Sequence, residues 1–240
     1  MKLKLILLIT LALPTLGVQA KDCVILLHGL ARSSHSMDTL AEAFESQGYL
    51  VVNHNYPSTQ HDIPTLAKAE IPKAIDKCKS DGDIHFVTHS MGGILVRYYL
   101  NETAIKNLGR VVMLGPPNQG SEIVDELQNV PGFKLINGEA GMQLGTNRES
   151  IPKSLGEVNF ELGIIAGDTS FNPIYSSMLP DEDDGKVTVT STKVEGQRDH
   201  IVLPVTHTFM MKNPEVIQQC TYFIKNGKFQ HTETEENQPD

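Results

Sequence analysis

The chain has 240 residues, 29 of them acidic and 20 basic, which gives a formal net charge of −9. This length suits one domain with a substantial core. An acidic chain without a cluster of Lys and Arg is a poor partner for nucleic acid. The three cysteines, Cys23, Cys78 and Cys220, allow at most one internal disulfide, and the sequence does not select the pair. Their spacing matches no zinc-binding pattern, so we expect no metal site.

The first 20 residues have the pattern of a secretory signal peptide. Lys2 and Lys4 precede an apolar run over residues 5–18. Because this run is shorter than the roughly 20 residues that span a bilayer, we expect no stable membrane anchor after cleavage. A lipid anchor on Cys23 is disfavoured because the residue before it is acidic rather than small. The sequence therefore predicts export to the periplasm or the medium, with a mature chain that begins near Lys21.

Between the signal peptide and the C-terminal tail, over residues 21–230, short apolar runs alternate with helical patterns. The expected strands are residues 23–27, 49–53, 84–88, 110–114, 162–166 and 200–205. The expected helices are residues 36–47, 63–78, 91–101 and 214–224. Strands that are nearly continuous in apolar character suit a parallel sheet with both faces covered. We predict an α/β fold, a three-layer α/β/α sandwich with about six parallel strands.

Two segments depart from this alternation. Residues 121–161 separate the fourth and fifth strands and are rich in Gly and Asn, and connections of this length are usually functional. We expect a lid or cap-like insertion, with core packing as the alternative role for its apolar residues. The candidates for lining a substrate groove are Leu127, Val130, Phe133, Leu135, Ile136 and Met142. Residues 231–240 are polar and acidic, and we expect a disordered tail.

A serine follows the third expected strand directly. In Thr88-His89-Ser90-Met91-Gly92-Gly93 the chain passes from a buried strand into a helix at Ser90. So sharp a turn strains the backbone and exposes the serine hydroxyl, and it requires small residues nearby. Gly92 and Gly93 meet this need, whereas Thr88 stands where a first glycine is usual. Ser90 is therefore the candidate nucleophile, and a helix N-cap is the alternative role.

The first strand runs into His28-Gly29-Leu30, which supplies a second part of such a site. Loops at the carboxyl edge of a parallel sheet face each other. The backbone N–H groups of Leu30 and Met91 are the expected oxyanion hole. His28 and His89 are expected to pack or to shape turns.

A serine nucleophile needs a base, and three histidines follow it in sequence. His231 lies in the polar tail, and His200 opens the last expected strand. His207 follows the carboxyl end of that strand, where a loop brings its imidazole toward Ser90. We predict that His207 is the base, so activity rises with pH through about 6 to 7 as a histidine base loses its proton.

The acid that orients the base is expected between Ser90 and His207, after the fifth strand. We predict Asp184, because a flexible glycine and then an apolar anchor follow it in Asp184-Gly185-Lys186-Val187. Asp168, nearest the end of the strand, is the alternative. The acidic run over residues 181–184 also suits a solvated loop or a weak calcium site.

Taken together, these motifs resemble the bacterial lipase and esterase branch of the α/β-hydrolase fold. The turn over residues 115–121 after the fourth strand adds to the resemblance. Because the first strand begins so soon after the cleavage site, the chain is similar to the minimal lipases of this fold. The resemblance implies a triad of Ser90, Asp184 and His207 and no organic cofactor.

The resemblance also implies hydrolysis of a lipid or small-molecule carboxylic ester through an acyl-enzyme. Thioesterase, amidase or acyltransferase activity with the same triad is the alternative. A non-catalytic binding or accessory protein with this fold is the alternative from another class, because fold alone does not determine function.

Overall fold

The computed structural model describes residues 20–231, and within this range the chain forms a six-stranded sheet. Every neighbouring pair of strands is parallel, in the order β2-β1-β3-β4-β5-β6. The strands are β1 (Cys23–Leu27), β2 (Leu50–His54), β3 (Ile84–His89), β4 (Leu108–Leu114), β5 (Leu162–Gly167) and β6 (Asp199–Leu203). The predicted sheet is confirmed.

Four helices cover the sheet, close to the predicted positions. They are α1 (Asp38–Ser46), α2 (Ile63–Lys77), α3 (Met91–Glu102) and α9 (Pro214–Asn226). The first predicted helix is divided, since a 3₁₀ turn, η1 (Ser34–Met37), precedes α1. The start of α9 shows why its sequence forms a helix. Asn213 accepts hydrogen bonds from the first backbone N–H groups, Pro214 occupies the first turn, and Gly227 ends the helix with φ 72°.

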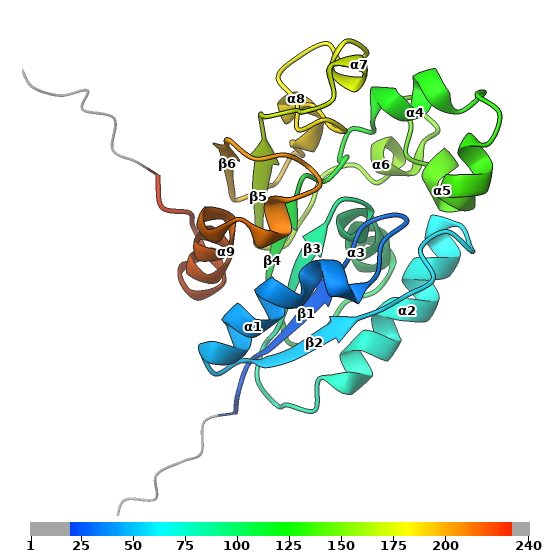
Figure 1. Cartoon of the computed structure of the whole chain (residues 1–240). Helices are drawn as coiled ribbons and strands as arrows, with labels where there is room; N and C mark the ends of the chain where they lie inside the picture. The colour runs from blue at the N-terminus through cyan, green and yellow to red at the C-terminus, as the bar shows by residue number, and fades with distance from the viewer. Residues whose placement is uncertain (1–19, 232–240) are drawn as a thin grey trace, which may run out of the picture.

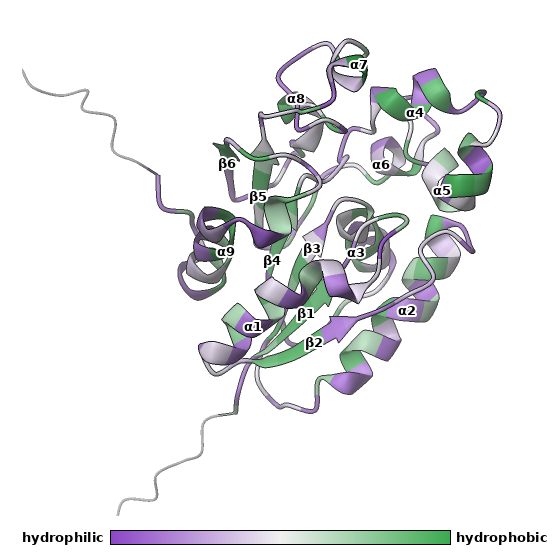
Figure 2. Ribbon diagram, in the orientation of Figure 1, coloured by the Kyte–Doolittle hydropathy of each residue, from purple (hydrophilic) through white to green (hydrophobic). Residues whose placement is uncertain are grey.

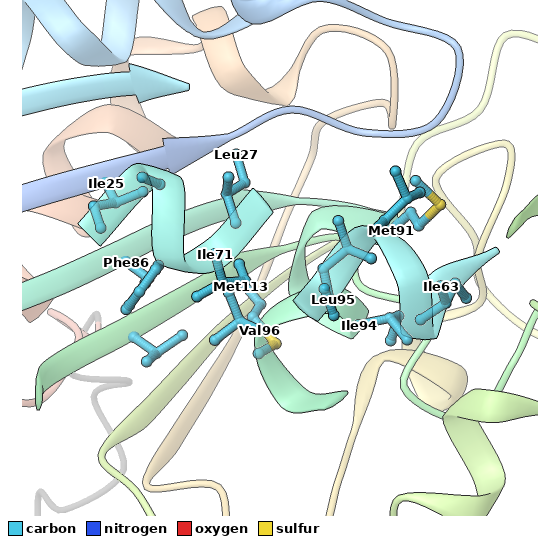
Figure 3. Close-up of a cluster of buried hydrophobic side chains, with 14 of the residues drawn as sticks. Ile25, Leu27, Ile63, Ile71, Phe86, Met91, Ile94, Leu95, Val96 and Met113 are labelled. Atoms are coloured by element: carbon cyan, nitrogen blue, oxygen red, sulfur yellow. The ribbon is translucent and has the colours of Figure 1, made fainter. Parts of the chain in front are cut away.

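The alternation of side chains along each strand creates two separate cores. Ile25 and Leu27 of β1 pack with α2 and α3 on one face, where Figure 3 shows Ile71 and Leu95 in the same cluster. The intervening Val24 and Leu26 pack with α1 and α9 on the other face. Because successive side chains of a strand point to opposite faces, a fully apolar strand must be buried on both sides. The three-layer sandwich is thereby confirmed.

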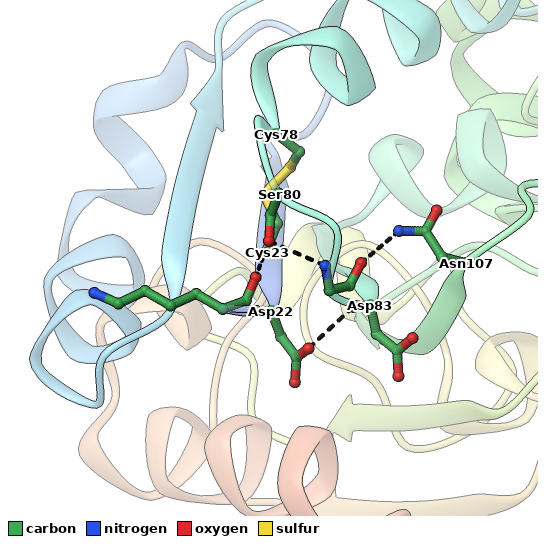
Figure 4. The surroundings of a disulfide bond; sticks show 8 residues. Asp22, Cys23, Cys78, Ser80, Asp83 and Asn107 are labelled. Carbon is green, nitrogen blue, oxygen red and sulfur yellow. Dashed lines mark hydrogen bonds between the residues drawn. A yellow bond between two sulfur atoms is a disulfide. The ribbon is translucent and has the colours of Figure 1, made fainter. Parts of the chain in front are cut away.

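A disulfide joins Cys23, the first residue of β1, to Cys78, the residue after α2. Cys220 is a free and fully buried cysteine of α9. Around the disulfide, the backbone N–H of Asp83 donates to Asp22 Oδ1 at 2.9 Å, and Ser80 Oγ donates to the carbonyl of Lys21 (Figure 4). These contacts tie the beginning of β1 to the turn before β3.

Five short helices lie between β4 and β6. They are α4 (Glu122–Leu127), α5 (Phe133–Met142), α6 (Ile151–Ser154), α7 (Pro173–Ser176) and α8 (Val189–Thr192). In Figure 1 they gather at one end of the molecule, beyond the carboxyl ends of the strands. Residues 121–161 thus form a partly helical cover, and a role as a moving lid stays a prediction. Figure 2 shows strongly hydrophobic residues along α4 and α5.

The two ends of the chain carry predictions that stay open. Residues 1–19 of the predicted signal peptide and residues 232–240 of the predicted tail lie outside the described residues. None of the helices between residues 20 and 231 combines the length and the apolar composition that crossing a bilayer requires.

The order of the strands determines where loops converge. The chain leaves β1 for β2 at the edge of the sheet and then returns to β3 on the other side of β1. At such a reversal the connections leave on opposite faces of the sheet, which opens a crevice at the carboxyl ends of the strands. The loop after β1 and the turn after β3 border this crevice.

Candidate active site

Ser90 stands alone between β3 and α3, with φ 53° and ψ −124°. Positive φ is costly for a residue with a side chain and is concentrated at functional sites. The backbone N–H of Ser90 donates to the carbonyl of Leu114 at 2.8 Å, which holds the turn against β4. The side chain of Ser90 makes no capping hydrogen bond with α3. The structure therefore favours an exposed hydroxyl over the N-cap alternative.

Small residues after Ser90 permit the tight turn. A Cβ on Gly92 would lie 2.8 Å from the carbonyl oxygen of Leu27, so no larger residue fits between α3 and β1. Thr88 is fully buried, and its Oγ1 lies 3.2 Å from the position that a Cβ on Gly93 would take. Gly93 thus leaves room for the threonine that departs from the usual pattern.

His207 and Asp184 form a buried pair. Nδ1 of His207 lies 2.7 Å from Oδ2 of Asp184, and the backbone N–H of His207 donates to the carbonyl of Asp184 at 2.8 Å. The other carboxylate oxygen accepts from the N–H groups of Lys186 and Val187 at 3.0 and 2.9 Å. The contact with an ionised carboxylate requires a proton on Nδ1, which leaves Nε2 of neutral His207 as a base.

Gly115, just after β4, makes room for this pair. Its φ is +52°, and a Cβ there would lie 2.8 Å from Oδ2 of Asp184 and 3.1 Å from Nδ1 of His207. The turn over residues 115–121 is recognisable in the sequence, but this requirement is not. A glycine directly after a buried strand was the sequence feature that could have indicated this close approach.

The carboxylates of the other acidic residues in this part of the chain have partners other than His207. Asp168 is exposed, and its carboxylate accepts a hydrogen bond from Thr169. Asp183 is buried, but it accepts from Ser176 Oγ at 3.0 Å and from a backbone N–H in its own turn. In the described part of the chain, no group of three or more His, Cys, Asp or Glu side chains has an arrangement suited to a metal ion.

The other two candidate histidines have different partners. Nε2 of His200 lies 2.9 Å from Thr192 Oγ1, and Nε2 of His231 lies 2.9 Å from Asp199 Oδ1. Among the three histidines that follow Ser90, only His207 lines the pocket that Ser90 also lines.

The loop after β1 carries Leu30 and is held in place by the loop after β2. The hydroxyl of Tyr56 donates to the carbonyl of His28 at 2.6 Å, and the two rings stack 4.2 Å apart. Ala31 has φ 53°, and its N–H donates to Ser58 Oγ at 3.1 Å. Both predicted oxyanion donors belong to residues that border the crevice, since Met91 opens α3. The supporting roles of Tyr56 and Ser58 were missed, because no local pattern links them to residue 28.

His89 connects the serine turn to the base. Nε2 of His89 lies 2.9 Å from the carbonyl oxygen of His207, and the rings are 4.7 Å apart between centroids. Burial and, next, the charge of His207 hold the pKa of His89 well below its usual range. His89 is therefore a neutral donor that supports the loop of His207, a larger role than shaping the turn.

Ser90 and His207 line one pocket of about 490 Å³. Among the apolar residues predicted for a groove, Leu127, Phe133 and Ile136 line it. The other three candidates, Val130, Leu135 and Met142, do not line it: Val130 precedes α5, and Leu135 of α5 is exposed to solvent. Ile123, Val124 and Leu144 line it instead. The pocket therefore has a largely apolar wall formed by the cover.

Comparisons with known proteins give a partial match in sequence and a likeness of fold. Residues 19–130 match the family model described as "Putative serine esterase (DUF676)", a range that includes Ser90 and Leu30 but neither Asp184 nor His207. No curated protein matches the chain in sequence.

Several solved structures are similar. The mature lipase BlEst2 from Bacillus licheniformis has a TM-score of 0.65 at 20% identity, over 87% of this chain and 93% of that one. Lipase B from Aspergillus fumigatus has a TM-score of 0.61 at 16% identity, over 86% of this chain and 53% of that one. Phospholipase PlaB from Legionella pneumophila has a TM-score of 0.58 at 18% identity, over 72% and 46% of the two chains.

At these identities the structural likeness establishes the fold, and the family model adds a likeness in sequence over residues 19–130. The predicted resemblance to the lipase and esterase branch is thereby confirmed. The chain has the α/β-hydrolase fold, and its residues 19–130 match a family of serine esterases.

Proposed function

We propose that the protein is a serine hydrolase that cleaves carboxylic esters, with Ser90 as nucleophile, His207 as base and Asp184 as the acid that orients it. One observation carries the proposal: a serine in a strained turn shares a pocket with a histidine whose Nδ1 is bound to a buried carboxylate. A nucleophile, its base and a group that orients the base are the parts that acyl transfer requires.

In the first half of the reaction, Ser90 Oγ attacks the ester carbonyl carbon and passes its proton to Nε2 of His207. The backbone N–H groups of Leu30 and Met91 stabilise the oxyanion. The C–O bond then breaks, and the alcohol leaves with the proton from His207. In the second half, water gives a proton to His207 and attacks the acyl-enzyme, and that proton returns to Ser90 as the carboxylic acid departs.

The apolar wall of the pocket supports an acyl chain rather than a polar acyl group. Ile123, Val124, Leu127 and Leu144 offer aliphatic contact beside Ser90. The same triad acts on thioesters, amides and other acyl acceptors, so these substrates are alternative outcomes of the test.

Two measurements test the proposal. A fluorophosphonate probe should label the wild-type chain once, at Ser90, and should leave the folded Ser90→Ala variant unlabelled. A series of p-nitrophenyl esters of increasing acyl length then separates an esterase, which prefers short chains, from a lipase, which prefers long ones. A folded wild-type chain that takes up no label would identify a binding protein instead.

We also propose that the chain is exported, to the periplasm or the medium. Disulfides persist mainly in oxidising compartments, and the bond between Cys23 and Cys78 supports this location. Fractionation of expressing cells should recover the chain outside the cytoplasm, with a mass that corresponds to a start near Lys21. Recovery of the full-length chain in the cytoplasm would contradict export.

A further inference from the structure

Two positively charged side chains line the pocket of Ser90, and neither is neutralised. Arg32 follows β1, and Lys186 follows Asp184. Within residues 20–231, neither side chain forms an ion pair or a hydrogen bond. By contrast, Arg110 pairs with Glu161 at 2.7 Å and Lys68 pairs with Glu102 at 2.9 Å.

Backbone contacts fix the positions from which the side chains of Arg32 and Lys186 extend. Arg32 follows Ala31, which has a positive φ and is held by Ser58 Oγ. The backbone N–H of Lys186 donates to the carboxylate of Asp184, so this residue is fixed to the triad acid. Both cations are thus set by the same elements that build the site.

The two charged groups lie in partly buried surroundings beside the same pocket. Arg32 is half-buried, and burial lowers its pKa, although a guanidinium stays charged. The ammonium of Lys186 lies 4.8 Å from the ring centre of Tyr175, which also lines the pocket. The side chain of Lys186 is exposed overall, but its charged end lies among protein atoms. This desolvation, followed by the charge of Arg32, lowers the pKa of Lys186.

The pocket therefore has two chemically different walls. Residues from α4 and α5 supply the apolar wall, whereas the loop after β1 and the turn after Asp184 supply the charged one. Two cations that line one pocket repel each other, and an anion bound beside both would remove that cost. Arginine in particular binds phosphate and carboxylate through paired hydrogen bonds.

We propose that the pocket selects esters whose alcohol portion carries an anionic group, bound by Arg32 and Lys186 while the acyl chain lies against α4 and α5. This inference rests on the proposed ester hydrolysis and specifies its substrate class. A phosphate and a carboxylate are both suitable anions, and substrates of each kind distinguish them.

Three lauroyl esters with a common acyl chain make the test, used below their critical micelle concentrations. They are monolauroylglycerol, which is neutral, lauroyl lysophosphatidic acid, which carries a phosphate, and lauroyl glycolate, which carries a carboxylate. Release of lauric acid gives kcat/KM for each. We expect at least one anionic ester to exceed the neutral one. The Arg32→Gln/Lys186→Gln double variant should lower the ratio of anionic to neutral kcat/KM by about 10- to 100-fold, because charge-assisted hydrogen bonds are lost.

Matched variants separate a local effect from one of net charge. Lys106 is exposed and precedes β4, at the opposite end of the sheet, so Lys106→Gln should leave the ratio unchanged. Arg32→Lys keeps the charge but loses the paired geometry, and it should retain part of the preference.

A binding measurement keeps this inference distinct from the proposed function. In the Ser90→Ala background, titration calorimetry should give tighter binding of an anionic ester than of monolauroylglycerol, and the double variant should abolish the difference. If the Ser90→Ala chain shows no such preference, or if the double variant keeps it, the anion site is overturned even where ester hydrolysis holds. If the preference is present but wild type hydrolyses no ester, the anion site stands and the proposed function fails.

Discussion

Two regions border the pocket, the end of the sheet and the cover of short helices, and they differ in how firmly the fold holds them. At the end of the sheet, the residues on each side of Ser90 are buried, since His89 is 1% exposed and Met91 is fully buried. The opposite wall is a cover of short helices, where Leu135 is 89% and Ile136 67% exposed. Reacting groups must be held in position by rigid elements, whereas loops and covers tolerate variation. We therefore expect the residues at the end of the sheet to carry out the reaction and the cover to select the acyl chain.

A second difference lies within the reacting groups themselves. Ser90 is placed by elements adjacent in the chain, because β3 and α3 flank it directly. Asp184 and His207 are held in long loops by a few hydrogen bonds, including the support of His89. The following predictions test this division, in order of expected effect.

Ser90 and His207 should act as one unit. Ser90→Ala and His207→Ala should each lower kcat for a p-nitrophenyl ester by about 10⁶-fold, and the double variant by little more, because neither group works without the other. If the double variant instead lost the sum of the two single effects in activation free energy, the assignment of Ser90 and His207 as a pair would be contradicted.

Asp184 should matter less than the serine. Asp184→Asn keeps the shape but removes the charge that fixes the proton on Nδ1 of His207, so kcat should fall by about 10⁴-fold. Asp168→Asn is the matched control and should have little effect, because Asp168 is exposed and its carboxylate accepts a hydrogen bond from Thr169 rather than from the base. A larger loss at Asp168 would reverse the assignment.

The disulfide should stabilise the folded domain. A bond that closes a loop of 55 residues restricts the unfolded chain, and its reduction should lower the free energy of unfolding by about 4 kcal/mol. Urea unfolding with and without reductant measures the effect. Cys220→Ala should show the same loss on reduction, since Cys220 takes no part in the bond. Equal stability in both conditions would contradict this role.

The smallest expected effect concerns the cover. Ile136 lines the pocket, and Ile136→Gln should raise KM for a dodecanoyl ester about fivefold, because apolar contact worth about 1 kcal/mol is lost. Leu135→Gln should leave KM for the same monomeric ester unchanged, because Leu135 points to solvent. Equal effects at both positions would indicate that the cover rearranges when substrate binds.

The sequence alone determined those features that depend on residues close together in the chain. The six apolar runs with intervening helical patterns predict the parallel sheet, because burial on both faces demands continuous apolar strands. Ser90 was predictable for the same reason, since the strand, the turn and the helix that expose it are contiguous.

The tertiary structure alone decided which distant segments meet. It joined Cys23 to Cys78, paired Asp184 rather than Asp168 with His207, and brought Arg32 to the same pocket as Lys186. The glycine and the apolar anchor after Asp184 favoured it in the sequence, but no local pattern contains the other two pairings, because each depends on how segments distant in the chain come together. The chemistry of Ser90 is thus encoded locally, and the shape and charge of its pocket arise only on folding.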